Sequence, residues 1–265
     1  MGILDGKRLL ITGVLTDASL AFAVASLAQK EGAKVVLTGA GRGLTLTQRT
    51  ARKLPTKPDV LEFDVTSPEQ AEAVQAWLGE RWGRVDGALH AIGFAPETCL
   101  GEDFMAADWD DVKVALEVSA YSLKTVAAVV APLMHDGGSI VGLDFDARFA
   151  WPAYNWMGVA KAALESTSRY LARSLGPDGI HESPLGIDGI GQPRITAEWM
   201  WASAALVALH QHLRRAVEED NPEPLDDRAH LGDAGERLSI DRVTAQGEGH
   251  AVQRGLRAPR QVGHL

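Results

Sequence analysis

The stretch RLLITGVLTDASLAFAVA, residues 8–25, decides the fold. The run RLLIT predicts a β-strand, and the residues from Ser19 onward predict an amphipathic helix. Gly13 permits the tight turn between them, and Ser19 is small enough for a ligand to approach the backbone. Thr16, Asp17 and Ser19 are candidate caps for the helix, whose free N–H groups and dipole suit a pyrophosphate. An ordinary capped helix after a strand would give the same pattern, so the rest of the chain must decide.

The same alternation of strand and helix patterns continues to about residue 180. Apolar runs predict strands at 8–12, 34–39, 60–65, 87–93 and 138–145. Amphipathic stretches predict helices at 19–31, 67–82, 108–131 and 154–175. Strands that are apolar throughout and separated by helices indicate a parallel sheet covered on both faces. We therefore expect an α/β domain with a doubly wound parallel sheet, Rossmann-like, over residues 1–180.

Composition restricts the classes of function. The chain has 265 residues, 46% of them hydrophobic, and it shows no apolar run that we expect to span a bilayer. Its formal net charge of −9 argues against nonspecific nucleic-acid binding. The single cysteine, Cys99, excludes an intrachain disulfide framework, and MGILDGKRLLITG reads as a strand rather than a targeting signal. We expect a cytoplasmic protein without membrane or nucleic-acid partners that acts on small molecules.

Residues 181–265 differ in character from the rest of the chain. They contain no Lys, Phe or Tyr, yet they hold six of the eight histidines. Segment 197–219 predicts one helix, and the remainder predicts loop or disorder rather than the sixth and seventh strands that such a domain normally has. His210 and His212 are two residues apart and would lie on different helix faces, so we expect no metal site. The C-terminal region is therefore expected to be atypical and poorly ordered.

The segment YNWMGVAK, residues 154–161, holds the most informative pair of polar side chains. Tyr154 and Lys161 are seven residues apart, which on a helix is about two turns, roughly 10 Å, and nearly the same face. The spacing permits an active-site pair. A buried aromatic and a solvated lysine on one helix are the alternative.

Residues at the ends of the predicted strands could contact a dinucleotide. The second strand ends in VVLTGAGRG, without the acidic residue that often binds an adenosine ribose, and Arg42 could stack on adenine or pair with a 2′-phosphate. Asp64 and Val65 close the third strand, where an adenine edge would lie. Gly93 ends the fourth strand, where a cofactor would approach the backbone. A surface arginine and ordinary turn residues would give the same pattern.

Together, ITGVLTDASLAF, LEFDV, HAIGF, GGSIVGLDFD and WPAYNWMGVAKAALES resemble the enoyl-acyl-carrier-protein reductases of the short-chain dehydrogenase/reductase superfamily. The likeness is to the InhA-type branch and covers about residues 3–180. Its most specific element is Tyr-x6-Lys. The broader superfamily uses Tyr-x3-Lys, and the residue four before Lys161 is Met157, which cannot do acid–base chemistry.

The resemblance implies roles for individual residues. Tyr154 and Lys161 would be catalytic, Phe145 would lie near the nicotinamide and substrate, and Tyr154 and Met157 would contact the acyl substrate. Cofactor contacts would come from residues at the strand ends and on the last helix: Gly13, Ser19 and Leu20 at the pyrophosphate, Asp64 and Val65 at the adenine, Ile92 and Gly93 at the nicotinamide, and Lys161 at its ribose.

The resemblance also implies a cofactor, a substrate and an assembly. We expect NADH-dependent reduction of the trans-2 double bond of an enoyl chain carried by acyl carrier protein, in a homo-oligomer, by resemblance a tetramer. Ala40 stands where the InhA-type branch has an aromatic residue beside the adenine, which weakens the preference for NADH over NADPH without reversing it, so NADPH stays the less favoured cofactor. PRIT, 193–196, faintly resembles the family's next cofactor segment. Two alternatives stay open: a related carbonyl reductase, and an inactive remnant or a product of a reading frame altered near codon 180.

Overall fold

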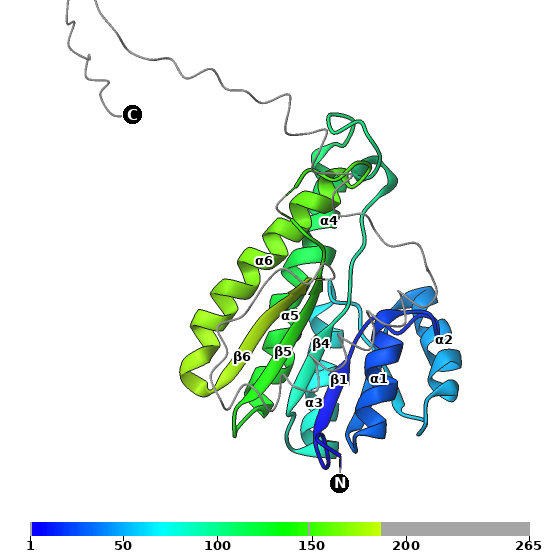
Figure 1. Ribbon diagram of the computed structural model, residues 1–265, viewed down its shortest axis with the longest axis vertical. Coiled ribbons are helices and arrows are strands. Elements are labelled where there is room, and N and C mark those ends of the chain that lie inside the picture. The colour runs from blue at the N-terminus through cyan, green and yellow to red at the C-terminus, as the bar shows by residue number, and fades with distance from the viewer. Residues whose placement is uncertain (1, 148, 187–265) are drawn as a thin grey trace, which may run out of the picture. The chain divides into compact units, whose positions relative to one another are not determined.

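The computed structural model describes residues 2–147 and 149–186, and the side chains of 183–186 are left aside. In this part of the chain six parallel strands form one sheet in the order β3-β2-β1-β4-β5-β6 (Figure 1). The strands are β1 (Arg8–Ile11), β2 (Lys34–Gly39), β3 (Asp59–Glu62), β4 (Gly87–His90), β5 (Gly138–Asp144) and β6 (Ile180–Gly186). The strand order reverses between β1 and β4, which is where doubly wound sheets bind ligands at the carboxyl ends of their strands. The expected fold class is confirmed.

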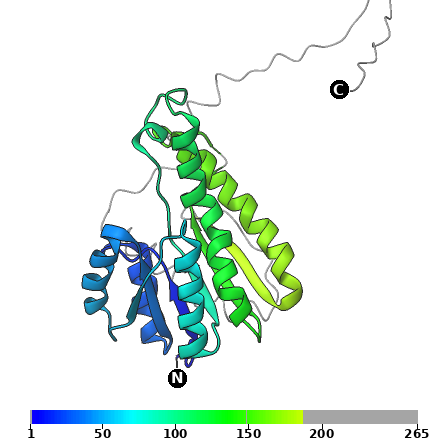
Figure 2. The ribbon, with the colours of Figure 1, turned by 180° about the vertical axis from the view of Figure 1, so that it is seen from behind.

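Helices cover both faces of the sheet. They are α1 (Leu20–Lys30), α2 (Gly41–Thr50), α3 (Pro68–Trp82), α4 (Trp109–Leu116), α5 (Ser122–Val130) and α6 (Asn155–Leu175). Short helical turns complete the described elements: η1 (Ala51–Lys53), η2 (Glu97–Cys99), η3 (Glu117–Tyr121), η4 (Ala131–Leu133) and η5 (Gly176–Asp178). Figure 2 shows α3, α5 and α6 on the face opposite α1 and α2.

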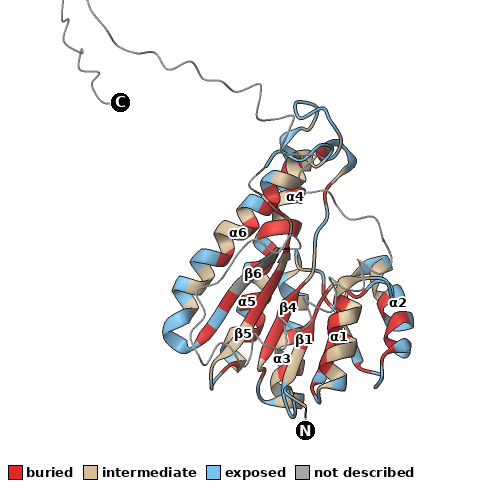
Figure 3. Ribbon diagram, viewed as in Figure 1, coloured by how far each residue is buried: buried red, intermediate tan, exposed pale blue. Residues whose placement is uncertain are grey.

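Buried residues run along the strands and the helices that cover them (Figure 3), and the alternation of side chains along a strand divides them into two apolar layers. Leu10 packs with residues of α3, α5 and α6, whereas its neighbour Ile11 packs with residues of α1. Ile140 and Val141 of β5 divide in the same way between the two layers. Because the inner strands β1, β2, β4 and β5 are buried on both faces, their sequences are mostly apolar without alternation, and this made these strands recognisable.

Two elements were not predicted. The sequence GRGLTLTQRT forms α2, which buries Thr47 and Thr50, and Thr50 Oγ1 donates to Leu15 O in the loop after β1 at 2.9 Å. The expectation that no sixth strand follows residue 180 was wrong, because β6 pairs with β5 along its whole length, from Gly138↔Ile180 to Asp144↔Gly186. Backbone pairing with β5 holds β6 in the sheet, and the polar sequence of β6 does not by itself predict a strand. The described residues all lie within the compact unit Met1–Asp220.

The predicted helix 108–131 is interrupted. The chain passes from α4 through η3, a π-helical turn, into α5. An 18-residue stretch within Trp109–Leu133 has a mean hydropathy of 1.5 and passes the length and composition test for a membrane span, so the expectation of no such run was wrong. Half of this stretch is buried inside the domain, as in the core helix of a soluble protein. The predicted helix 197–219, the segment 193–196 and the pair His210 and His212 lie outside the described residues.

Candidate active site

The turn after β1 is packed against the end of β4. Thr12 Oγ1 donates to Leu89 O at 3.0 Å and accepts from Ala91 N at 2.9 Å. Gly13 has φ +80°, and a Cβ added there would lie 2.0 Å from Ala91 O. Only glycine combines this backbone conformation with so close an approach, so Gly13 fixes how the loop between β1 and α1 leaves the sheet.

The first turn of α1 is not capped by a side chain. Ser19 is its N-cap residue, but Ser19 Oγ donates to Thr16 O at 2.6 Å and makes no cap hydrogen bond. The expectation that Thr16, Asp17 or Ser19 caps this helix was wrong. Thr16 contributes its carbonyl, and Asp17 instead forms a 2.5 Å ion pair with Lys53. Phe22 N and Ala23 N donate to Ser19 O, so the N–H groups of Leu20 and Ala21 are the ones at the start of α1 that stay available as donors.

The residues predicted to contact an adenine, Asp64 and Val65, lie in the loop after β3, because β3 ends three residues earlier than predicted. Asp64 Oδ1 accepts from Thr66 N at 2.9 Å and from Thr66 Oγ1 at 2.7 Å, so this carboxylate closes a turn. Val65 packs against the core from the same turn. Arg42 is exposed in the first turn of α2. The contacts of Asp64 account for its residue type without a ligand, and its role at an adenine stays a prediction.

Tyr154 and Lys161 both contact the end of β5, although they come from different turns of one helix. The Tyr154 ring lies 4.8 Å from the Phe145 ring, centroid to centroid, and Phe145 directly follows β5. Lys161 Nζ donates to Leu143 O at 3.0 Å and lies 3.9 Å from Asp144 Oδ1. The structure thus brings three of the predicted site residues to one place at the carboxyl edge of the sheet.

Burial shifts the pKa of both Tyr154 and Lys161. It raises the pKa of the Tyr154 phenol, and the negative charge of Asp144 raises it further. The phenol therefore stays protonated and able to donate at neutral pH. Burial lowers the pKa of the Lys161 ammonium, and Asp144 opposes that shift. A buried lysine that keeps an adjacent carboxylate is unlike the solvated helix lysine that was the alternative.

His90 ends β4 beside this pair and was not predicted as a site residue. Its Nε2 lies 2.7 Å from Ser122 Oγ, and Ser122 Oγ donates its own hydrogen to Val118 O at 2.7 Å. Ser122 therefore accepts, and His90 Nε2 must be the donor of a neutral imidazole. Burial, with the nearby positive charge of Lys161, lowers the pKa of His90 to about 3. The side chain is a fixed neutral dipole next to Lys161.

The remaining predicted residues lie around the same edge. Ile92 and Gly93 follow β4, and Ser119 of η3 accepts from the N–H of the next residue, Phe94, at 2.9 Å and donates to its carbonyl at 2.7 Å. Met157 packs beside Trp156 against a small apolar cluster that includes Cys99. Ser119 was missed because nothing in its own neighbourhood reveals a contact with a residue 25 positions earlier in the chain.

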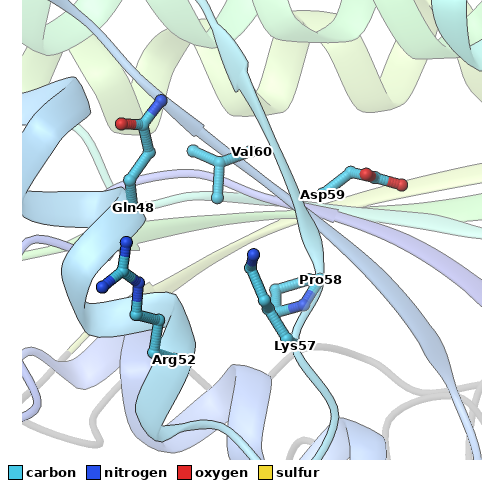
Figure 4. A pocket seen from close by; sticks show the side chains of 6 residues that line it. All are labelled: Gln48, Arg52, Lys57, Pro58, Asp59 and Val60. Carbon is cyan, nitrogen blue, oxygen red and sulfur yellow. The ribbon is translucent and has the colours of Figure 1, made fainter.

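A separate open pocket lies at the opposite edge of the sheet. It is lined by Gln48, Arg52, Lys57, Pro58, Asp59 and Val60 (Figure 4). Asp59 is the first residue of β3, so this pocket lies at an amino end of the strands, away from the Tyr154 edge. Within the described ranges no three His, Cys, Asp or Glu side chains are grouped as metal ligands would be.

The comparisons with known proteins converge on one family. The family model described as enoyl-(acyl carrier protein) reductase matches residues 13–182. The chain is 46% identical over 187 residues to the enoyl-acyl-carrier-protein reductase (NADH) of Mycolicibacterium smegmatis, covering 69% of each chain. It is 44% identical over 186 residues to that of Mycobacterium avium, again over 69% of each. With the Escherichia coli reductase (NADH) FabI it shares 36% identity over 188 residues, 70% of this chain and 71% of that one.

Proposed function

This chain belongs to the enoyl-acyl-carrier-protein reductase family, and from that premise we propose that it reduces the trans-2 double bond of an enoyl thioester with NADH. The observation that carries the proposal is the arrangement of Tyr154, Phe145 and Lys161 at the end of β5. The tyrosine and lysine have Tyr-x6-Lys spacing. Met157 occupies the position, four residues before Lys161, where a Tyr-x3-Lys enzyme would have its tyrosine. The proposed reaction belongs to fatty acid synthesis.

The cofactor is NADH, as in the relatives named above. The uncapped start of α1 supplies donors of the kind a pyrophosphate needs, and Gly13 keeps the turn beside it narrow. We assign Ser19 and Leu20 to the pyrophosphate, Ile92 and Gly93 to the nicotinamide, and Asp64 and Val65 to the adenine. When bound, NADH supplies the hydride that reaches the β-carbon of the substrate.

Tyr154 would act where charge develops. Negative charge builds on the thioester oxygen as the β-carbon is reduced, and a phenol aimed at that oxygen stabilises it more in the transition state than in the ground state. The raised pKa of Tyr154 keeps the phenol in the donor form. The α-carbon then takes a proton from solvent or through Tyr154. Phe145, in contact with the Tyr154 ring, restricts the directions open to that ring.

Lys161 would bind the nicotinamide ribose and contribute positive charge. Its ammonium is held at Leu143 O, so it lies at the end of β5 before any ligand arrives. Met157, on the same helix, would line the acyl chain from the side of the Cys99 cluster.

The acyl chain is delivered by acyl carrier protein, the substrate carrier that the relatives' names imply. We further propose a cytoplasmic homotetramer. Its support is exposed aromatic side chains, with Tyr170 of α6 71% exposed and Tyr121 of η3 55% exposed. Light scattering on the purified full chain tests the tetramer, and a monomeric mass would contradict it. The relatives support enoyl reduction, and no contact among the described residues favours a carbonyl reductase or an inactive remnant.

The direct test follows NADH oxidation with a trans-2-enoyl thioester. We expect turnover by the wild-type chain and a loss of about 100-fold in kcat for Tyr154→Phe, with the KM for NADH unchanged, because one donor to a developing oxyanion is removed. Tyr170→Phe is the matched control, since this exposed phenol lies on the same helix. A well-folded wild-type chain without turnover, or a fully active Tyr154→Phe, would refute the proposal.

A further inference from the structure

Tyr154 lies between two residues in the left-handed backbone region. Ala153 has φ +60° and Asn155 has φ +48°, and they are the only described residues other than glycine with positive φ. L-residues rarely adopt this conformation, and alanine has no side-chain hydrogen bond with which to offset it. Two such residues around one side chain persist only where surrounding contacts hold them there.

The contacts that hold them come from one segment of the chain, residues 101–104. Gly101 N donates to Ala153 O at 2.9 Å, and Asn155 Nδ2 donates to Asp103 O at 3.1 Å. Trp156 Nε1 donates to Phe104 O at 3.1 Å, and the two rings are stacked with centroids 4.6 Å apart and planes 14° apart. Residues on both sides of Tyr154 are therefore tied to the same short segment, about 50 positions earlier in the chain.

These ties determine where the Tyr154 ring points. Tyr154 is the N-cap residue of α6, and its backbone N–H donates to Trp151 O at 3.2 Å. Its ring reaches Phe145 on one side, and its Cδ1 lies 3.6 Å from the place a Cβ on Gly158 would take. A relaxation of φ at 153 or 155 toward the common helical region would rotate the Cα–Cβ bond of Tyr154 away from this position.

We propose that Asn155 and Trp156 are positioning residues for the reaction, which hold Tyr154 in its donor orientation by binding segment 101–104. The inference rests on the proposed function, in which Tyr154 donates to the thioester oxygen. Neither residue needs to touch substrate or cofactor. Trp156 contributes a hydrogen bond and a stacked ring, and Asn155 contributes a hydrogen bond from a residue type that tolerates positive φ better than most.

The first readout is independent of activity. The chain has three tyrosines, Tyr121, Tyr154 and Tyr170, so the full chain labelled with 13C at tyrosine Cζ gives three resonances, and Tyr154→Phe assigns one of them. Trp156→Phe keeps a stacking ring and removes the N–H donor. Asn155→Gly removes the side-chain donor and still accepts positive φ. In both variants we expect only the Tyr154 resonance to move, with its titration midpoint lower because the phenol is less buried.

The second readout is steady-state kinetics with NADH and a trans-2-enoyl thioester. We expect kcat to fall about tenfold in each variant, with the KM for NADH within twofold of wild type. Trp77→Phe is the matched control, because it makes the same chemical change in α3, where Trp77 packs edge-on against Trp82, and it should leave both readouts unchanged. If Trp156→Phe fails to fold, the Asn155→Gly variant tests the positioning role in its place.

The two readouts separate the possible failures. An unmoved Tyr154 resonance overturns the positioning role, even if kcat falls. A moved resonance with wild-type kcat also overturns it, because the orientation would then not matter for the reaction. If the wild-type chain has no turnover, the proposed function fails, and the resonance alone still decides whether residues 155 and 156 position Tyr154.

Discussion

The first and last strands of the described sheet are specified in opposite ways. β1 lies in the middle of the sheet, its residues Leu10 and Ile11 are buried in the two apolar layers, and its turn requires Gly13. β6 lies at the edge and carries Glu182, which is only 7% exposed and accepts a hydrogen bond from Ser168 of α6. Glu182 Oε1 is buried without a partner among the described residues. The apolar sequence of β1 is thus sufficient to predict a buried strand. The polar sequence of β6 is not, and β6 is held in the sheet by pairing with β5 and by its contact with α6.

The largest effect is expected at the turn after β1. Gly13→Ala combines backbone strain of about 1–3 kcal/mol with a steric overlap between the new Cβ and Ala91 O. We expect the free energy of unfolding to fall by about 4 kcal/mol or more. Urea unfolding measures it. Gly41→Ala is the control, since Gly41 also has positive φ but its added Cβ would meet nothing within 4 Å, and about 1 kcal/mol is expected. Equal losses in the two variants would mean that the close approach to Ala91 is not what specifies this turn.

The edge strand should make stability depend on pH. Burial raises the pKa of Glu182 from 4.5 to about 7, so the folded chain holds the proton more tightly than the unfolded chain. The contribution of protonated Glu182 to the free energy of unfolding is fully present below pH 4.5. It is lost as the pH rises through 7, by on the order of 3 kcal/mol. Unfolding of the full chain between pH 4.5 and 8 measures this slope.

Glu182→Gln should remove that part of the pH dependence and stabilise the protein at pH 8. Glu62→Gln, at an exposed position of the opposite edge strand β3, should leave the pH profile unchanged. If Glu182→Gln and wild type have parallel pH profiles, the buried carboxyl is not a weak point of β6.

The smallest expected loss of stability comes from the N-cap residues, and it differs between α3 and α1. Ser67 caps α3 by accepting from Gln70 N, and Ser67→Ala should cost about 1 kcal/mol. Ser19 makes no such bond at α1, so Ser19→Ala should cost less in stability but weaken NADH binding. Thermal unfolding and NADH titration by fluorescence measure the two quantities. A stability loss at Ser19 equal to that at Ser67 would show that α1 is capped in solution and not left open for a phosphate.

The sequence predicted those parts of the site that depend on neighbouring residues. A glycine after an apolar run predicted the turn at Gly13, and the segment YNWMGVAK, through its resemblance to the enoyl reductases, predicted Tyr154 and Lys161 as the catalytic pair, whose roles stay predictions. What it did not reveal depends on contacts across the fold. The ties of Asn155 and Trp156 to segment 101–104 span 52 positions, and no local pattern encodes such a contact.

The missed secondary structure has a similar explanation. α2 contains glycine and β-branched residues of low helix propensity, and β6 contains a glutamate and a proline, so tertiary packing overrides local preference in both. The boundary predicted at residue 180 falls at the first residue of β6, and the family match ends at residue 182. The divergent character of 181–265 stays a prediction from composition.

We propose that hydride from NADH reaches a carbon–carbon double bond beside Tyr154. The most direct measurement uses NADH carrying deuterium at both C4 positions with a trans-2-enoyl thioester, followed by mass spectrometry of the acyl product. The account predicts one deuterium at C3 of a saturated thioester, with formation slowed about 100-fold in Tyr154→Phe. Deuterium on a carbonyl carbon of a different substrate, with the enoyl thioester returned unchanged, would contradict it.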